Sequence, residues 1–162
     1  MLFRSTQSKL VRAQDLGLDA GILASDADRL TPALTANETQ GGYDVVLDLV
    51  GGPYVAATLP AMASKGRIVV VGLLAGPRSE INLATVLARR LSVTGTVLRS
   101  RPLEEKIQAA DLLRRTLSPW LARGMIAPVI EAVVPLEQAA EAHRLVASNA
   151  TFGKVLLSVG GE

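Results

Sequence analysis

Unbroken apolar runs, rather than alternating ones, are the clearest pattern along this chain. The segment GRIVVVG at 66–72 places consecutive aliphatic residues between two glycines, and YDVVLDL at 43–49 has a similar apolar centre. An antiparallel strand with one face in water alternates apolar and polar residues, whereas the strands of a parallel sheet are covered by helices on both faces. We therefore predict buried parallel strands over 43–49 and 66–71.

Helical patterns separate these strands as far as residue 101. Further short strands are predicted at 1–3, 20–23 and 91–98. Helices are predicted to begin at Thr6 and Asn82, which have the side chains of good N-caps, and at the turn Gly51-Gly52-Pro53. Strands that alternate with helices in this way are typical of βαβ units in an α/β fold.

The pattern changes after Pro102. Apolar residues at helical spacing form one stripe on a long helix that is predicted to run from Leu103 to Gly124. A strand at 129–134, a helix at 136–147 and a strand at 154–159 follow. We therefore place a domain boundary at Pro102, which divides the chain into residues 1–101 and 102–162.

The ends of the predicted strands form the first candidate site. Gly51-Gly52 follow the strand at 43–49, and Gly72 ends the strand at 66–71. In open parallel sheets, ligands bind outside the carboxyl ends of the strands. Glycine at such an end allows a backbone or a ligand to approach closely. We expect a flat, polar ligand to lie across these ends.

Composition narrows the classes of function. The 162 residues include no cysteine and one histidine, which cannot build the usual nitrogen and sulfur shell of zinc, so no metal site is predicted. Without cysteine, disulfides and thiol catalysis are excluded, and a cytoplasmic location is the default expectation. Aromatic residues make up 3%, which argues against nucleic-acid binding, and no apolar stretch is long enough to span a membrane. His143 and Trp120 are predicted to pack in the core.

One motif of dinucleotide-binding folds is absent. The phosphate turn G-x-G-x-x-G follows the first strand of such folds, but no two glycines of this sequence stand two positions apart. Either the chain binds no dinucleotide, or it starts after that turn. The residues alone leave both alternatives open.

Several segments, in their order and spacing, resemble one enzyme family. They are KLVRAQDLGLD (9–19), DVVLDLVGG (44–52), GRIVVVG (66–72), TGTVLRSRP (94–102), PVIE (128–131), EAHR (141–144) and SNATFGKVLL (148–157). Together they resemble the carboxyl-terminal part of zinc-free medium-chain dehydrogenases/reductases. The similarity is to the NAD(P)H quinone oxidoreductase branch, in its p53-inducible-oxidoreductase-like subgroup.

That resemblance implies a fold. Residues 1–101 would form an incomplete Rossmann-like parallel sheet without the first strand and the glycine-rich turn. Residues 102–162 would be an α+β segment that returns to the barrel-like catalytic domain. The absent strand is central in the family's strand order, so we expect the strand at 1–3 either to pair directly with the strand at 43–49 or to lie loosely. Relatives pair their last Rossmann strand across a two-fold axis, which implies a homodimer through 91–98.

The resemblance also implies how the adenosine end of a cofactor binds. Lys9 matches the family lysine that meets the adenosine 2′-phosphate, and Thr6 and Ser8 could add hydroxyl donors at the same helix start. A cation there favours NADPH. NADH remains the alternative, because Leu23-Ala24 stand where many relatives carry an asparagine-tyrosine pair whose tyrosine also meets that phosphate. The alternative for Lys9 itself is a solvated lysine.

Other positions match the rest of the family's cofactor site. Strand-end positions whose backbone lines the adenosine and nicotinamide sides in relatives correspond to Leu49, Val50, Val71, Gly72 and Leu73. Asn149 matches a polar position that relatives use against the cofactor from the facing domain. It is also a candidate helix C-cap in the left-handed conformation, and the two roles are compatible.

The implied reaction is transfer of a hydride from NADPH to a quinone-like electrophile, with the chemistry mainly in the cofactor and no catalytic residue assigned. An enoyl or alkenal reductase of the same superfamily is the alternative among enzymes, and a non-catalytic remnant is the alternative outside them. The truncated chain is expected to be inactive alone. The expected partners are a quinone or alkenal and a second copy of the chain.

Overall fold

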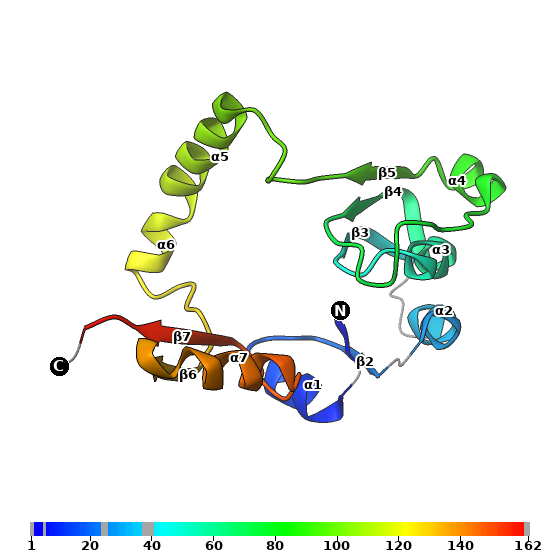
Figure 1. Cartoon of the computed structure of the whole chain (residues 1–162). Coiled ribbons are helices and arrows are strands. Elements are labelled where there is room, and N and C mark those ends of the chain that lie inside the picture. The colour runs from blue at the N-terminus through cyan, green and yellow to red at the C-terminus, as the bar shows by residue number, and fades with distance from the viewer. Residues whose placement is uncertain (1, 5, 24–25, 37–40, 161–162) are drawn as a thin grey trace. The chain divides into compact units, whose positions relative to one another are not determined.

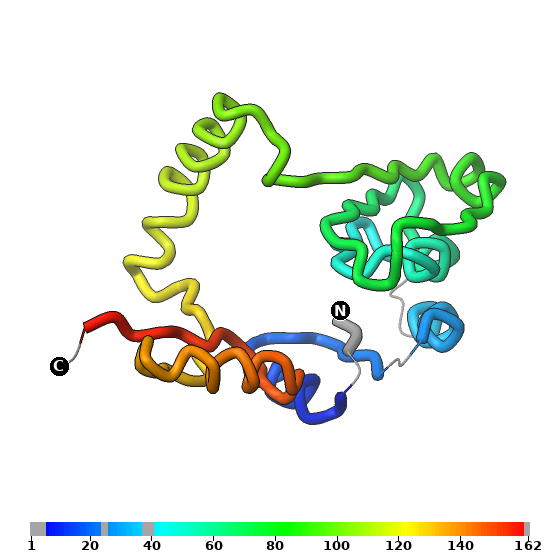
Figure 2. Tube along the Cα trace, in the orientation of Figure 1, coloured from blue at the N-terminus to red at the C-terminus, as the bar shows by residue number. Residues whose placement is uncertain are grey.

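Two compact units, Met1–Ser100 and Arg101–Glu162, make up the computed structural model. It describes residues 2–4, 6–23, 26–36 and 41–160. Figure 1 labels the helices and strands, and Figure 2 follows the backbone through them. Both units are α/β arrangements in which the paired strands are parallel. The predicted α/β class with parallel strands is therefore confirmed.

In the first unit, helices alternate with strands as predicted. The elements are β1 (Leu2–Arg4), α1 (Gln7–Gln14), β2 (Gly21–Leu23), α2 (Ala27–Ala36), β3 (Tyr43–Asp48), α3 (Pro53–Thr58), η1 (Leu59–Ala61), β4 (Met62–Val70), α4 (Leu83–Arg89) and β5 (Ser92–Gly95). The predicted cap of α4 is confirmed, because Asn82 Oδ1 accepts the N–H groups of Ala84 at 2.9 Å and Thr85 at 3.4 Å.

The strands β3, β4 and β5 form a three-stranded sheet in that order. Its centre is Ile68, which is fully buried in a cluster with Leu59, Met62 and Leu91. On the opposite face of β3, Val45 and Leu47 are 52% and 63% exposed. The expected burial of both faces is therefore wrong for β3, because the helices that pack on this sheet cover the face of Ile68.

The strands β1 and β2 form a separate parallel pair. Leu2 lies opposite Gly21, and α1 connects the two strands. Leu10 of α1 is buried so close to Gly21 that a Cβ atom there would lie 2.9 Å from the leucine side chain. Of the two alternatives for the first strand, direct pairing with the strand at 43–49 is wrong, since this local βαβ unit places β1 beside β2 and, among the described strands, β3 pairs with β4 alone. Apart from its pairing with β2, β1 pairs with no other described strand, as the second alternative expects in part.

The second unit begins with two helices where one was predicted. Its elements are α5 (Leu103–Thr116), α6 (Ser118–Ala122), β6 (Ile130–Pro135), η2 (Leu136–Gln138), α7 (Ala139–Ala147) and β7 (Lys154–Ser158). The break falls at Leu117, and Pro119 lies in the first turn of α6. Proline has no N–H to donate to the preceding turn, so it begins a new helix more readily than it continues one.

The core of the second unit is small. The strands β6 and β7 are parallel, and α7 connects them and packs against both. Ala142 of α7 is buried, whereas the next residue, His143, is exposed because it lies about 100° further round the helix. Trp120 is 46% exposed. The expected packing of His143 and Trp120 in a core is therefore wrong.

Candidate functional site

The carboxyl ends of β3 and β4 lead into two loops at one edge of the sheet. We call residues 49–52 the β3 loop and residues 71–76 the β4 loop. Because β3 and β4 are parallel neighbours, with Asp48 opposite Val70, the two loops start side by side. This is the edge at which open α/β sheets bind their ligands.

The two loops are packed backbone against backbone. A Cβ atom on Gly72 would lie 2.4 Å from the carbonyl oxygen of Leu49, and one on Gly52 would lie 2.6 Å from that of Ala75. Both distances are too short for any side chain, so each position requires glycine. A hydrogen bond from the N–H of Ala75 to the carbonyl oxygen of Val50, at 2.8 Å, joins the loops further along. The β3 and β4 loops are therefore packed together as one unit.

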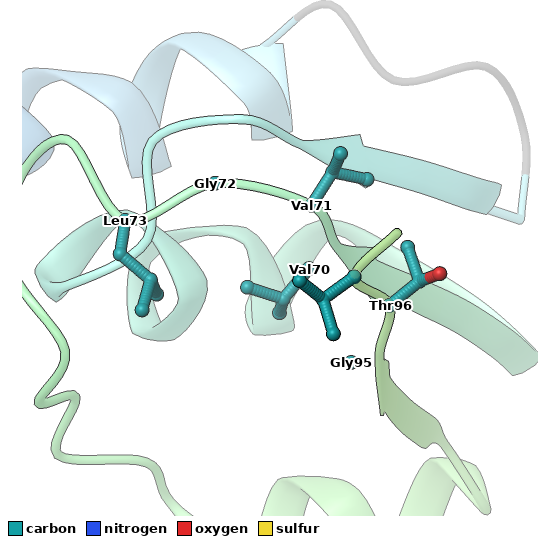
Figure 3. A pocket seen from close by; sticks show the side chains of 7 residues that line it. Val70, Val71, Gly72, Leu73, Gly95 and Thr96 are labelled. Carbon is teal, nitrogen blue, oxygen red and sulfur yellow. The ribbon is translucent and has the colours of Figure 1, made fainter. Parts of the chain in front are cut away.

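A pocket of about 330 Å³ opens beside the β4 loop (Figure 3). Its lining comes from the ends of β4 and β5 and the residues after them, namely Val70, Val71, Gly72, Leu73, Gly95, Thr96 and Val97. The N–H of Thr96 donates to the carbonyl oxygen of Val70 at 3.0 Å, which holds the two strand ends together. The pocket is shallow and open, and its wall is mainly aliphatic.

The structure brings five of the predicted site residues together. Val71, Gly72 and Leu73 line the pocket, and Leu49 and Val50 lie in the loop packed against them. Sequence reasoning missed the contribution of β5, which supplies Gly95, Thr96 and Val97. The signal was the glycine in LSVTGTVL. The apolar run predicts a strand as far as residue 98, which hides this glycine, whereas β5 ends at Gly95.

A second group of predicted site residues lies at the start of α1. Thr6 occupies the N-cap position, but its side chain makes no capping hydrogen bond, and its buried hydroxyl has no partner among the described residues. The exposed Ser8 follows, and Lys9 is 5% exposed. The alternative of a solvated lysine is therefore wrong. Of the pair Leu23-Ala24, the second residue lies outside the described residues.

Asn149, the last predicted site residue, lies in the second unit. It follows α7 in the left-handed conformation, with φ of 55°, and its N–H donates to the carbonyl oxygen of Val146 at 3.2 Å. Ser148 is the C-cap of α7, and Asn149 is the residue after it, where a left-handed residue commonly ends a helix, so its predicted role in ending the helix is confirmed one position beyond the C-cap. The role against the cofactor stays a prediction.

The donor groups of this chain do not fit a zinc site. Within the part of the chain that the structure describes, no three histidine, cysteine or acidic side chains gather where a metal ion could bind. The sequence itself offers one histidine and no cysteine. Over the same described residues, no helix is long and apolar enough to cross a membrane.

This chain is similar in sequence to known proteins. A family described as zinc-binding dehydrogenase matches residues 16–157. Quinone oxidoreductase from Mus musculus is 32% identical over 125 residues, which cover 76% of this chain and 36% of that protein. The chain thus spans about a third of the length of the curated relatives it matches.

Solved structures share its fold. An NAD-dependent alcohol dehydrogenase is 31% identical with a TM-score of 0.71, over 98% of this chain and 43% of that one. CurA from Vibrio vulnificus, solved in complex with NADPH, is 24% identical with a TM-score of 0.69, over 99% of this chain and 50% of that one, which shows the fold alone. Motifs, family match and fold agree: the chain belongs to the zinc-binding dehydrogenase family, among the medium-chain oxidoreductases.

Proposed function

We propose that this chain forms the cofactor-binding part of an NADPH-dependent quinone oxidoreductase. The observation that carries the proposal is the pocket beside the joined β3 and β4 loops, at the ligand-binding edge of a parallel sheet. The similarity to the mouse quinone oxidoreductase supports a quinone-like electrophile as the hydride acceptor.

The pocket suits the nicotinamide end of the cofactor. Its aliphatic wall gives a flat ring an apolar surface, and the backbone of Val71, Gly72 and Leu73 runs along it. Leu49 and Val50 in the neighbouring loop would line the adenosine side. Because a Cβ atom on Gly72 has no room, the loops keep a fixed shape, and the ring meets a preformed surface.

The start of α1 suits the 2′-phosphate of NADPH. Ser8 offers an exposed hydroxyl to an anion, whereas the hydroxyl of Thr6, which has no partner among the described residues, is buried and would have to become exposed first. Lys9 is one turn further along, and its burial means that its ammonium must turn outward to reach a phosphate. The similarity to the NAD-dependent alcohol dehydrogenase keeps NADH as the alternative.

Bound NADPH would supply the hydride, and this chain would supply its position. The aliphatic pocket wall would cover part of the bound ring, and the hydrogen bond between the two loops would hold the surrounding backbone in place. No acid or base of this chain is assigned to the reaction. The family name implies zinc, but the donor groups do not fit it, so the proposal contains no metal-dependent step.

A second candidate within the superfamily is the reduction of an enoyl or alkenal substrate. The segment VLRSRP at 97–102 favours the quinone branch, because it resembles that subgroup. The remaining candidate is a non-catalytic protein that keeps the fold without turnover.

Cofactor binding by the 162-residue chain tests the proposal. Titration with NADPH, followed by nicotinamide fluorescence, should show saturable binding. Removing the ammonium with Lys9→Met should weaken NADPH binding about tenfold and leave NADH binding unchanged, because the contact is with the 2′-phosphate. Arg12→Met, which removes an exposed cation from the same helix, is the matched control and should change neither.

Turnover then separates the candidates. We expect the chain alone to be inactive, and active only once a substrate-facing domain is supplied, as in a fusion to the amino-terminal part of the mouse quinone oxidoreductase. That fusion should oxidise NADPH with a para-quinone faster than with an enoyl thioester. The reverse order would favour the second candidate. Absence of NADPH and NADH binding by a folded chain would contradict the proposal.

A further inference from the structure

Asp48, the last residue of β3, has a buried carboxylate that accepts hydrogen bonds from the backbone of the loop that follows it. The residue is 4% exposed, and its Oδ1 accepts the N–H groups of Val50 at 2.8 Å and Gly51 at 3.0 Å. Both donors belong to the β3 loop. The side chain therefore satisfies two backbone donors of a turn in which Gly51 and Gly52 both have positive φ angles.

The backbone of the same residue holds the other loop. The carbonyl oxygen of Asp48 accepts the N–H of Val71 at 2.7 Å and, more weakly, the N–H of Gly72 at 3.3 Å. Val71 and Gly72 are the first residues of the β4 loop and line the pocket. One residue thus bonds to both loops, through its side chain on one side and its main chain on the other.

We propose that Asp48 is a positioning residue, whose carboxylate fixes the β3 loop against the β4 loop at the edge of the sheet where the cofactor would bind. The inference rests on the proposed function, in that these loops carry the cofactor. Without Oδ1, two buried or half-buried N–H groups lose their acceptor, and unpaired donors of this kind are costly. The β3 loop would then open, and the tight contact between Leu49 and Gly72 would be released.

Only one oxygen of the carboxylate is needed for this role. Asp48 Oδ2 is buried and has no hydrogen-bond partner among the described residues. An asparagine at this position would keep the Oδ1 acceptor and change only the unbonded atom. The proposal therefore makes a sharp distinction between Asp48→Asn, which keeps the acceptor, and Asp48→Ala, which removes it. A residue needed for its charge would fail in both variants.

The test measures loop order and cofactor binding separately in the 162-residue chain. Hydrogen exchange of the Val50 and Gly51 amides, followed by NMR, reports the loop without any cofactor. Asp48→Ala should speed this exchange about tenfold and weaken NADPH binding about tenfold, because the Val50 and Gly51 amides both lose their acceptor. Asp48→Asn should keep both values near those of the wild type. Asp44→Ala, at an exposed position of the same strand, is the matched control.

The outcomes distinguish this inference from the proposed function. If the wild type binds neither NADPH nor NADH, the proposed function fails, while the amide exchange still decides whether Asp48 fixes the loop. Unchanged exchange in Asp48→Ala, or fast exchange in Asp48→Asn, would overturn the positioning role. If Asp48→Ala does not fold, Asp48→Asn decides alone: retained protection and affinity support the role, and loss of either contradicts it.

Discussion

Gly72 lies where the β3 and β4 loops meet, and its missing side chain sets the distance between them. A Cβ atom on residue 72 would lie 2.4 Å from the carbonyl oxygen of Leu49. Both groups are backbone, so neither can rotate away as the end of a long side chain would. The spacing of the loops, and with it the shape of the pocket, therefore depends on a single hydrogen atom at this position.

We predict that Gly72→Ala destabilises the chain by roughly 1–3 kcal/mol, the usual effect of overpacking a tight site. Gly95→Ala is the control, because a Cβ atom there meets nothing within 4 Å and the residue has an ordinary strand conformation. It should change the free energy of unfolding by less than about 0.5 kcal/mol. Urea denaturation followed by far-UV circular dichroism measures both. Equal stability of the two variants would contradict the close contact of the loops.

At the scale of single residues, the sequence predicted the positions of glycines at strand ends better than it predicted the hydrogen bonds of polar side chains. Gly51, Gly52 and Gly72 could be assigned to strand ends because glycine directly after an apolar run is typical of the end of a buried strand. The N-cap position of Thr6 is confirmed, but the absence of its capping hydrogen bond could not be predicted, since a bonded and an unbonded N-cap hydroxyl look alike in a sequence. The two bonds of Asp48 Oδ1 depend on loop geometry, which no local pattern encodes.

Among the described elements, β5 is one of the two edge strands of the sheet β3-β4-β5, and all four of its residues are exposed. The N–H of Thr96 points toward β4, where it meets the carbonyl oxygen of Val70. Strand residues alternate, so the N–H of Thr94 also points inward and that of Val93 points outward. We propose that this outward side of β5 pairs with the same strand of a second copy.

We predict that Val93→Pro converts a dimer into a monomer, because it removes the outward N–H and leaves the bonds to β4 in place. Val93→Thr keeps the N–H and should remain dimeric. Size-exclusion chromatography with light scattering distinguishes the two masses. A monomeric wild type, or a dimeric Val93→Pro variant, would contradict pairing through β5.

The type of an element, helix or strand, was predictable where its apolar run was long and where the residues that determine it are neighbours in the sequence. The apolar centres of β3 and β4 and the cap of α4 all follow from neighbouring residues. The lengths of β5 and of the helix that begins at Leu103 did not follow. Apolar residues continue past Gly95, and the stripe on that helix continues past Leu117. In the second case Pro119 outweighs the periodicity, since it has no N–H for the preceding turn.

The two units differ in how much apolar surface each one buries. The first unit holds two clusters of buried side chains, around Leu30 and around Ile68. In the second, Ala142 is the buried residue among those described, while Leu113, Trp120 and Val133 are 53%, 46% and 60% exposed. Since buried apolar area is the main source of stability, the second unit should be the weaker one.

We predict that the second unit unfolds at a lower urea concentration than the first. Trp120, the single tryptophan, reports the second unit by its fluorescence, and far-UV circular dichroism reports both units together. The fluorescence change should therefore precede the main change in circular dichroism. Coincident transitions would show one cooperative structure and contradict the difference in stability between the units.

The glycine contacts between the β3 and β4 loops also set where this protein can be redesigned. In a saturation mutagenesis library, Gly52 and Gly72 should reject every replacement, because the obstacle is the first carbon of any side chain. The start of α1 has no such constraint at the exposed Ser8. Coenzyme preference should therefore be altered by randomising positions around Ser8, with both loops left untouched.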